Sequence, residues 1–189
     1  MTDYAKIEAQ YENPIYFKNV SDLSQNEERA RWFRGYLGLP DGAFILELGA
    51  GKFTLTQAWQ NMGMNAWGVE WSEFGCYHYV EGAIRAMCQF LPFKPKSFDF
   101  VTAFDVYEHI PPEDLDLTLA DLARVAREHI AINVPFESIN PEDHHHLTKL
   151  DRKGWSSLFA RYFTEDQLPD EPVAGFNGNA TLFMLRVRN

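Results

Sequence analysis

The chain has 189 residues, of which 46% are hydrophobic and 15% aromatic, enough for one compact domain that buries about 70% of its extended surface. Acidic residues outnumber basic ones by 27 to 17, and the net charge of −10 argues against nucleic acid or an anionic membrane as a partner. No apolar stretch is long enough to span a membrane and the first residues lack signal-peptide order, so we expect a cytoplasmic protein.

The first 22 residues mix polar and aromatic side chains without a clean helical or strand period, and they include Tyr11 and Tyr16. Such a segment needs another surface to pack on. Ser24 and Glu27 have the spacing of a capping box, which predicts a helix that begins at Ser24. The helix should run to about Leu37, ended by Gly35, Gly38 and Pro40.

The most informative stretch follows, and it has the order strand, tight turn, helix. An apolar run over 44–48 ends in an acidic residue and two glycines, Gly49 and Gly51, and a helical pattern over 54–62 begins at once. Because glycine lacks Cβ, the backbone can turn sharply and a ligand can lie against its N–H groups at the positive end of the helix. The pattern predicts a nucleotide-like ligand.

A second strand over 65–70 ends in Glu70, placed where a carboxylate can accept hydrogen bonds from both ribose hydroxyls of such a ligand. A dinucleotide fingerprint requires glycine or alanine where this chain has Thr54, and here an acid, Glu47, stands two residues before the first glycine. The sequence therefore disfavours NAD.

Further apolar runs alternate with helical patterns along the rest of the chain. The predicted elements are helix 72–80, strand 84–88, strand 98–104, helix 113–127, strand 129–134, helix 151–160, a shortened sixth strand within 163–179, and a last strand 181–187. This alternation predicts a mostly parallel sheet with helices on both faces. Ligands of such sheets bind at the carboxyl ends of the strands, so the turns there should converge on one crevice.

Several motifs occur in a fixed order: Glu47-x-Gly49-x-Gly51, Glu70, Leu91-Pro-Phe93, Ser97–Val101, Asp105–Ile110 and Ile132–Phe136. Together they resemble class I S-adenosylmethionine-dependent methyltransferases of the small-molecule branch, although the family usually has a third glycine where this chain has Phe53. The resemblance implies an α/β, Rossmann-like, doubly wound, mostly parallel seven-stranded sheet with an antiparallel last strand. It also implies a single domain, with an N-terminal arm and cap helix (1–40), a cofactor-binding core (44–136) and a substrate-side part (137–189).

The resemblance implies S-adenosyl-L-methionine as cofactor and S-adenosyl-L-homocysteine as product. The residues expected to bind the cofactor are Glu47, Gly49, Ala50, Gly51, Glu70, Trp71, Cys88, Gln89, Phe90 and Asp105. The acid that commonly binds the adenine amino group ahead of the Leu-Pro-Phe segment is missing here. Adenine would then be held by backbone groups, by Gln89, or by stacking on Phe90.

Methyl transfer to a hydroxyl, phenol or amine of a small molecule also needs a base, and histidine suits neutral pH. The catalytic candidates are His109, His145 and His146, with His145 preferred as base or as the group that orients the acceptor. Substrate-side candidates are Tyr11, Tyr16, Glu108 and His144. The alternatives stay open that Glu108 and His109 only satisfy backbone groups, and that the three histidines are a solvated run.

We expect no metal site, because three consecutive histidines on one loop cannot all point at one ion. Cys76 and Cys88 lack the spacing of a redox or zinc motif and are expected to be free thiols. A second hypothesis is an S-adenosylmethionine-binding domain without chemistry that serves as a regulatory or partner subunit. In either case we expect a monomer or a homodimer.

Overall fold

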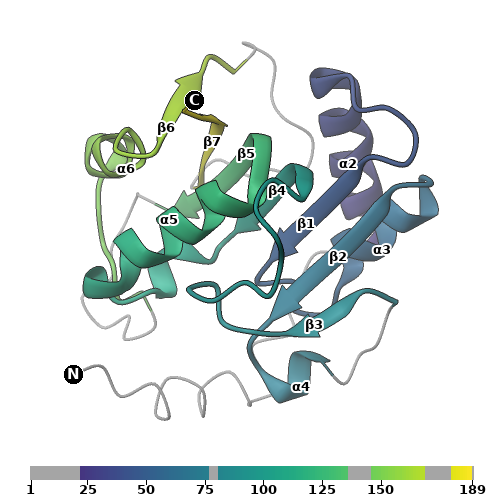
Figure 1. The fold of residues 1–189 in the computed structure, drawn as a ribbon, viewed down its shortest axis with the longest axis horizontal. Coiled ribbons are helices and arrows are strands. Elements are labelled where there is room, and N and C mark those ends of the chain that lie inside the picture. Colours follow the sequence, from purple (N-terminus) through teal and green to yellow (C-terminus); the bar gives the residue numbers. More distant parts are fainter. Residues whose placement is uncertain (1–21, 77–80, 136–145, 169–179, 189) are drawn as a thin grey trace.

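The computed structural model describes residues 22–76, 81–135, 146–168 and 180–188. Seven strands of this part form one sheet in the order β3-β2-β1-β4-β5-β7-β6 (Figure 1). The strands are β1 (Phe44–Leu48), β2 (Asn65–Glu70), β3 (Ala83–Arg85), β4 (Phe98–Phe104), β5 (Ala126–Pro135), β6 (Phe163–Asp166) and β7 (Ala180–Val187). The helices are α2 (Leu23–Leu37), α3 (Thr54–Asn61), α4 (Glu73–Cys76), α5 (Leu115–Val125) and α6 (Arg152–Phe159), with short 3-10 turns η2 (Tyr107–His109) and η3 (Pro112–Asp114).

The first five strands run parallel, whereas β7 lies antiparallel between β5 and β6. This confirms the predicted mostly parallel, seven-stranded, Rossmann-like sheet with an antiparallel last strand. Glu47 of β1 faces Gly68 of β2 on one side and Thr102 of β4 on the other. The carboxyl ends of β1, β2, β4 and β5 consequently reach the same edge, as the arrowheads of β1 and β2 show in Figure 1.

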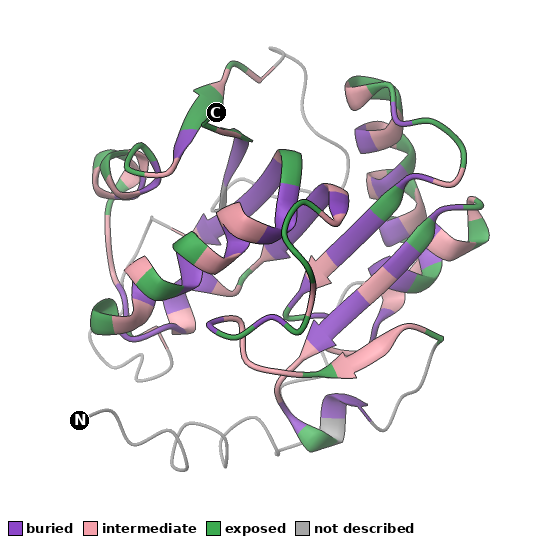
Figure 2. Cartoon of the chain, in the orientation of Figure 1, coloured by how far each residue is buried: buried purple, intermediate pink, exposed green. Residues whose placement is uncertain are grey.

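Helices cover both faces of the sheet, and each face has its own apolar core. Ile45 and Phe100 pack with α2 and α3, whereas their neighbours Leu46 and Val101 pack with α5 and α6. The change of side with each residue is the two-residue period of a strand. Figure 2 shows the resulting layers, with buried residues along the central strands and exposed ones on the outer faces of the helices.

The first described helix begins earlier than the capping-box prediction, because its N-cap is Asp22 and not Ser24. One carboxylate oxygen of Asp22 accepts hydrogen bonds from the Gln25 backbone N–H (2.9 Å) and from the Ser24 hydroxyl (2.7 Å). Glu27 pairs instead with Arg31 one turn later. Asp caps a helix as well as Ser does, so the acid two residues ahead is the N-cap.

Other boundaries also differ from the prediction. The strand expected over 84–88 is shorter, Ala83–Arg85, and helix α4 covers only Glu73–Cys76 of the expected 72–80, where 77–80 lie outside the described residues. The helix predicted over 113–127 stops at Val125, because Ala126 already has extended backbone and pairs with Phe98 of β4. Sheet pairing thus overrides helix propensity at that point.

Two further findings concern the whole described part. Cys76 and Cys88 are free thiols, as expected from their spacing. No helix in the described ranges has both the length and the apolar character that crossing a bilayer requires.

Candidate functional site

The turn after β1 forms one wall of the crevice. Gly49 and Gly51 both adopt left-handed backbone conformations, with φ of +64° and +53°. A Cβ atom on Gly49 would lie 2.5 Å from Cγ2 of Val106, in the turn after β4. Only glycine fits there without a shift of the chain, and the bare backbone leaves room for a ligand to approach the turn. Ala50, between the two glycines, is buried and donates its N–H to Val69 O (2.9 Å).

Phe53 occupies the position where a third glycine is usual, and its backbone keeps the glycine-like conformation, with φ of +59°. The side chain is fully buried and packs with Ala50 and Cys76. A Cβ on Gly68 of β2 would lie 2.5 Å from Cδ1 of Phe53, so the ring fills the space beside that glycine. The phenyl group is therefore packed under the turn.

Glu47 connects the end of β1 to the start of α3. Its Oε2 accepts hydrogen bonds from the backbone N–H of Thr56 (2.8 Å) and from the Thr56 hydroxyl. The N-cap of α3 is Phe53, which has no polar side chain, so Glu47 satisfies a free N–H of the first turn in its place. Burial raises the pKa of Glu47 to about 7, against the opposing effects of Thr56 and Arg29.

Glu70 holds the other side of the same turn. Its Oε2 accepts from Gly51 N (2.9 Å) and its Oε1 accepts from Ser72 N (2.9 Å). Gly75 of α4 packs so closely that a Cβ there would lie 2.6 Å from Cγ of Glu70. Each carboxylate oxygen can accept a second hydrogen bond. Trp71, the next residue, is half-buried, and its carbonyl accepts from Arg85.

Asp105 lies at the end of β4, with φ of +55°. Its Oδ1 accepts from Nδ2 of the buried Asn133 on β5 (3.0 Å), and its backbone N–H donates to Asn133 O. The surrounding protein withdraws water and raises the pKa of Asp105, whereas Asn133, Arg29 and His146 act in the opposite direction. Asp105 thus faces two cationic or potentially cationic side chains.

Arg29 is a site residue that the sequence analysis missed. It comes from α2, donates to Oδ1 of Asn26 (2.7 Å), and stacks its guanidinium 5.4 Å from the ring centre of Phe104. Burial lowers the pKa of Arg29, and the charges of Asp105 and Glu47 raise it. An arginine on an amphipathic helix resembles a solvent-facing residue in sequence, and only the packing of α2 against the sheet brings it here.

The segment expected to hold adenine follows β3. Gln89 is buried, Phe90 is 66% exposed, and burial raises the pKa of Cys88 to about 12. The next residue, Leu91, donates its N–H to Asp121 on α5 (2.6 Å). Arg124 of α5 donates to the carbonyls of Leu91 (2.9 Å) and Phe93. The Leu-Pro-Phe motif is therefore fastened to α5.

Glu108, His109 and His146 come together at the end of β4. Glu108 is buried in η2, and its Oε1 lies 3.9 Å from Nε2 of His109. The rings of His109 and His146 meet edge to face, 4.9 Å between centres. The cause is Thr148, whose N–H donates to Glu108 O (2.9 Å) and whose hydroxyl donates to Ile110 O (2.6 Å).

The structure thus brings most predicted site residues to one edge of the sheet, on the turns after β1, β2 and β4. The predictions for Tyr11, Tyr16, His144 and His145 fall on residues outside the described ranges. The cradle at Gly49, the carboxylate of Glu70 at the end of β2, and the pair Arg29 and Asp105 fit a ligand that joins a nucleoside to an amino acid.

Comparisons with known proteins give a domain match within the chain and a shared fold. Residues 46–129 match a family model described as a methyltransferase domain. A search of curated proteins gives no significant match. Among solved structures, 1,6-didemethyltoxoflavin-N1-methyltransferase of Burkholderia thailandensis, with bound 1,6-didemethyltoxoflavin and S-adenosylhomocysteine, gives a TM-score of 0.72 at 18% identity, covering 99% of this chain and 90% of that chain.

Two more structures show the same fold. A protein from Pyrococcus horikoshii gives a TM-score of 0.71 at 15% identity and covers 100% of both chains. The magnesium protoporphyrin IX methyltransferase of Synechocystis, with bound S-adenosylhomocysteine, gives 0.65 at 13% identity and covers 88% of this chain and 84% of that chain. Residues 46–129 thus match an S-adenosylmethionine-dependent methyltransferase domain, and the strand order is that of the fold which the solved structures share.

Proposed function

We propose that the protein methylates a small-molecule acceptor through a hydroxyl, phenol or amine group. The observation that carries the proposal is the cluster of Glu108, His109 and His146 beside Asp105, because it gives the crevice polar side chains that binding of the cofactor alone does not need. The names of the Burkholderia and Synechocystis enzymes give 1,6-didemethyltoxoflavin and magnesium protoporphyrin IX as the molecules methylated, and neither is a nucleic acid or a protein. The net charge of −10 also disfavours a nucleic acid acceptor.

We assign the cofactor side of the crevice as follows. The backbone of the Gly49–Gly51 turn lines the amino-acid and ribose end, and Glu70 accepts from the ribose hydroxyls with its remaining lone pairs. An α-amino acid end carries one carboxylate and one ammonium group, which Arg29 and Asp105 match in charge. Gln89 and the exposed ring of Phe90 are left for adenine.

S-adenosylmethionine, when bound, supplies a methyl group on a sulfonium sulfur with a neutral leaving group. The protein's own contribution is mainly positional, because holding two reactants in line can supply several kcal/mol of the barrier. Val106, against the Gly49 turn, and η2 fix the acceptor side relative to the cofactor side. The Glu108, His109 and His146 cluster then orients the acceptor and activates its proton-bearing atom. The role of His145 as base or orienting group stays a prediction.

Calorimetry and product analysis test this function. We expect wild-type protein to bind S-adenosylhomocysteine and not NAD, and Gly49→Val to lose binding, because the new side chain would collide with Val106. Gly63→Val, at a glycine that also has left-handed backbone (φ of +79°) but open space around it, is the matched control and should bind normally. Labelled S-adenosylmethionine with fractionated extract should then label the low-molecular-weight fraction. Labelling confined to RNA or protein would contradict a small-molecule acceptor.

A further inference from the structure

We propose that Glu108, His109 and His146 bind one divalent transition-metal ion of the zinc class on the acceptor side of the crevice. Each residue offers one ligand atom, and the three atoms lie within 4.8 Å of one another. Within the described residues, this is the single group of three or more histidine, cysteine and acidic side chains with such spacing. We expect no metal site from the run of three successive histidines, because they cannot all point at one ion. That expectation does not apply to this group, because it contains only one histidine of that run, His146.

The fold builds this group from two separate parts of the chain. Glu108 and His109 are neighbours in η2, which begins directly after the turn at Asp105. His146 lies just before Thr148, whose two hydrogen bonds fasten it to Glu108 O and Ile110 O. The two imidazoles therefore meet because the backbone holds them, and not because two flexible loops happen to cross.

The spacing is close to that of a metal site. Zinc binds histidine nitrogen and carboxylate oxygen at about 2.0–2.2 Å, so two ligands of a tetrahedral ion lie about 3.4 Å apart. Because the present atoms lie within 4.8 Å of one another, they would have to approach by at most about 1.4 Å. Half-buried His109 and His146 can supply this movement by rotation of their rings.

The donor set selects the ion. Two imidazoles with one carboxylate suit zinc, cobalt, nickel or iron, whereas magnesium and calcium prefer oxygen ligands throughout. The carboxylate of Asp105 lowers the electrostatic energy of a cation near His146. Three protein ligands also leave a coordination position open, as in catalytic zinc sites, while structural sites are closed by four.

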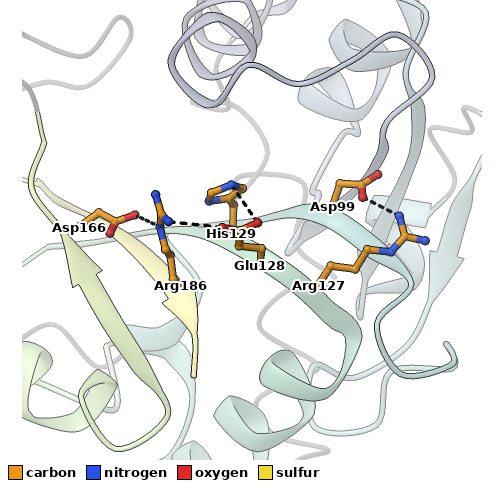
Figure 3. A network of polar contacts seen from close by, with 6 residues as sticks. All are labelled: Asp99, Arg127, Glu128, His129, Asp166 and Arg186. Carbon is orange, nitrogen blue, oxygen red and sulfur yellow. Dashed lines mark hydrogen bonds and ion pairs between the residues drawn. The ribbon is translucent and has the colours of Figure 1, made fainter. Parts of the chain in front are cut away.

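A second pair of adjacent glutamate and histidine residues has a similar spacing but lacks a second histidine beside it in the described part of the chain. On β5, Nε2 of His129 lies 3.7 Å from Oε2 of Glu128, which resembles the Glu108 and His109 spacing. Figure 3 shows that Glu128 there faces Arg186, which also pairs with Asp166. That pair has a cationic partner in the position where the acceptor-side pair has a second imidazole. It provides an internal control.

The consequence for catalysis rests on the proposed function. A hydroxyl of the acceptor takes the open position, the metal lowers the pKa of that hydroxyl, and its proton leaves to water. A lone pair of the resulting oxygen anion forms the bond to the methyl carbon. The carbon–sulfur bond breaks, and its electron pair stays on the sulfur, which becomes a neutral thioether. The inference thus favours hydroxyl and phenol acceptors over amines.

Cobalt absorption spectroscopy tests the site without any acceptor. Tag-free, chelator-treated protein should develop visible d–d bands with one equivalent of Co²⁺, and Zn²⁺ should remove them. His109→Gln, His146→Gln and Glu108→Gln should each weaken binding by at least the roughly 10- to 100-fold that loss of a group supporting a ligand costs. His129→Gln should bind as wild type does. The double variant His144→Gln with His145→Gln should also retain the bands.

Each outcome separates this inference from the proposed function, because the same samples are titrated with S-adenosylhomocysteine. Protein that binds S-adenosylhomocysteine without cobalt bands overturns the metal site and leaves methyl transfer standing. Cobalt bands without S-adenosylhomocysteine binding support the metal site and contradict the proposed function. Bands that persist in His109→Gln but vanish in the His144 and His145 double variant place the ion elsewhere and overturn the assignment.

Discussion

At the scale of single residues, the acidic side chains at the strand ends organise the protein backbone. Glu47 accepts from the first turn of α3, and Glu70 accepts from the N–H groups of Gly51 and Ser72. The same carboxylates therefore shape the cradle and border the place for the ligand. Substitution of Glu47 or Glu70 should therefore change both folding stability and cofactor affinity. How much each changes depends on whether the lost oxygen accepts from the backbone or faces the ligand.

We expect Glu70→Gln to weaken S-adenosylhomocysteine binding roughly tenfold to a hundredfold, the effect of about 1.5–3 kcal/mol from losing a charged acceptor. The amide NH₂ would also face the backbone N–H of Gly51 or Ser72, where a carboxylate oxygen accepts now. Isothermal calorimetry measures the effect. Glu73→Gln is the control, because Glu73 is an exposed acid of α4 that pairs with Arg85. An unaltered affinity in Glu70→Gln would place the ribose elsewhere.

The raised pKa of Glu47 predicts a pH-dependent stability. Its folded pKa of about 7 lies above the ordinary 4.5, so between these values the folded chain holds a proton that the unfolded chain has lost. This contribution is complete below pH 4.5 and is lost as the pH rises through 7.

In urea unfolding, the stability of wild type relative to Glu47→Gln should accordingly be greater at about pH 5 than at about pH 8, since glutamine cannot titrate. Glu27→Gln, at an acid on the surface of α2, controls for general charge effects. A difference that stays constant across this range would show that Glu47 keeps an ordinary pKa.

At the scale of elements, α5 holds the adenine segment through polar contacts. Asp121 and Arg124 bind the backbone of Leu91 and Phe93, and Arg124 also bonds Asp121. The segment has no strand of its own beyond Arg85, since β3 ends there. The position of the segment relative to β2 therefore depends on α5, a helix that follows β4 in the sequence.

Arg124→Met should loosen this segment without removing any residue assigned to the ligand. We expect a loss of about 1–3 kcal/mol in unfolding free energy, because backbone carbonyls lose a charged donor. S-adenosylhomocysteine should bind several-fold more weakly. Arg31→Met, at an exposed arginine paired with Glu27 within α2, should change stability by less than about 0.5 kcal/mol. Equal behaviour of the two variants in denaturation and calorimetry would contradict the fastening role.

Local pattern was sufficient for the elements that carry their own signals. The strand, glycine turn and helix from Phe44 to Asn61 agree with the prediction because burial, glycine geometry and helix entry all act within a short stretch. Boundaries failed where tertiary pairing decides, as at Ala126, or where a neighbouring residue is an equally good cap, as at Asp22. These choices depend on contacts that sequence periodicity does not contain.

The same division holds for the site. The topology rule placed Glu70 and Asp105 at one edge, because strand ends of a parallel sheet share it. Arg29 and Arg124 lie on helices, where arginine is common on the solvent side, and no sequence signal marks them. The meeting of His109 with His146 depends on the Thr148 hydrogen bonds, which join distant parts of the chain.

At the scale of the whole molecule, β7 connects the two cores. Phe183 and Leu185 pack into the core under α5 and α6, whereas Leu182 and Met184 pack into the core under α2 and α3. The strand also lies between β5 and β6. Neither core can therefore lose its packing on this strand without exposing the other.

Substitutions on the two faces of β7 should report one cooperative transition. Phe183→Ala is expected to cost about 3–5 kcal/mol and Met184→Ala about 2–5 kcal/mol, since both side chains are buried. Both should leave the denaturant m-value unchanged, with circular dichroism and tryptophan fluorescence in step. Leu117→Ala, on the exposed side of α5, is the control. Separate transitions in the two variants would show that the cores unfold independently.

The contact of Gly49 with Val106 has a thermodynamic consequence. A backbone that reorders at Gly49 when a nucleoside enters must move Val106, which lies three residues before His109. We therefore expect occupancy of one half of the crevice to alter affinity in the other, and linkage requires that the effect be reciprocal and equal in size. Saturating S-adenosylhomocysteine should change the dissociation constant for Co²⁺ by the same factor by which saturating Co²⁺ changes the dissociation constant for S-adenosylhomocysteine. Val106→Ala should bring this factor closer to one.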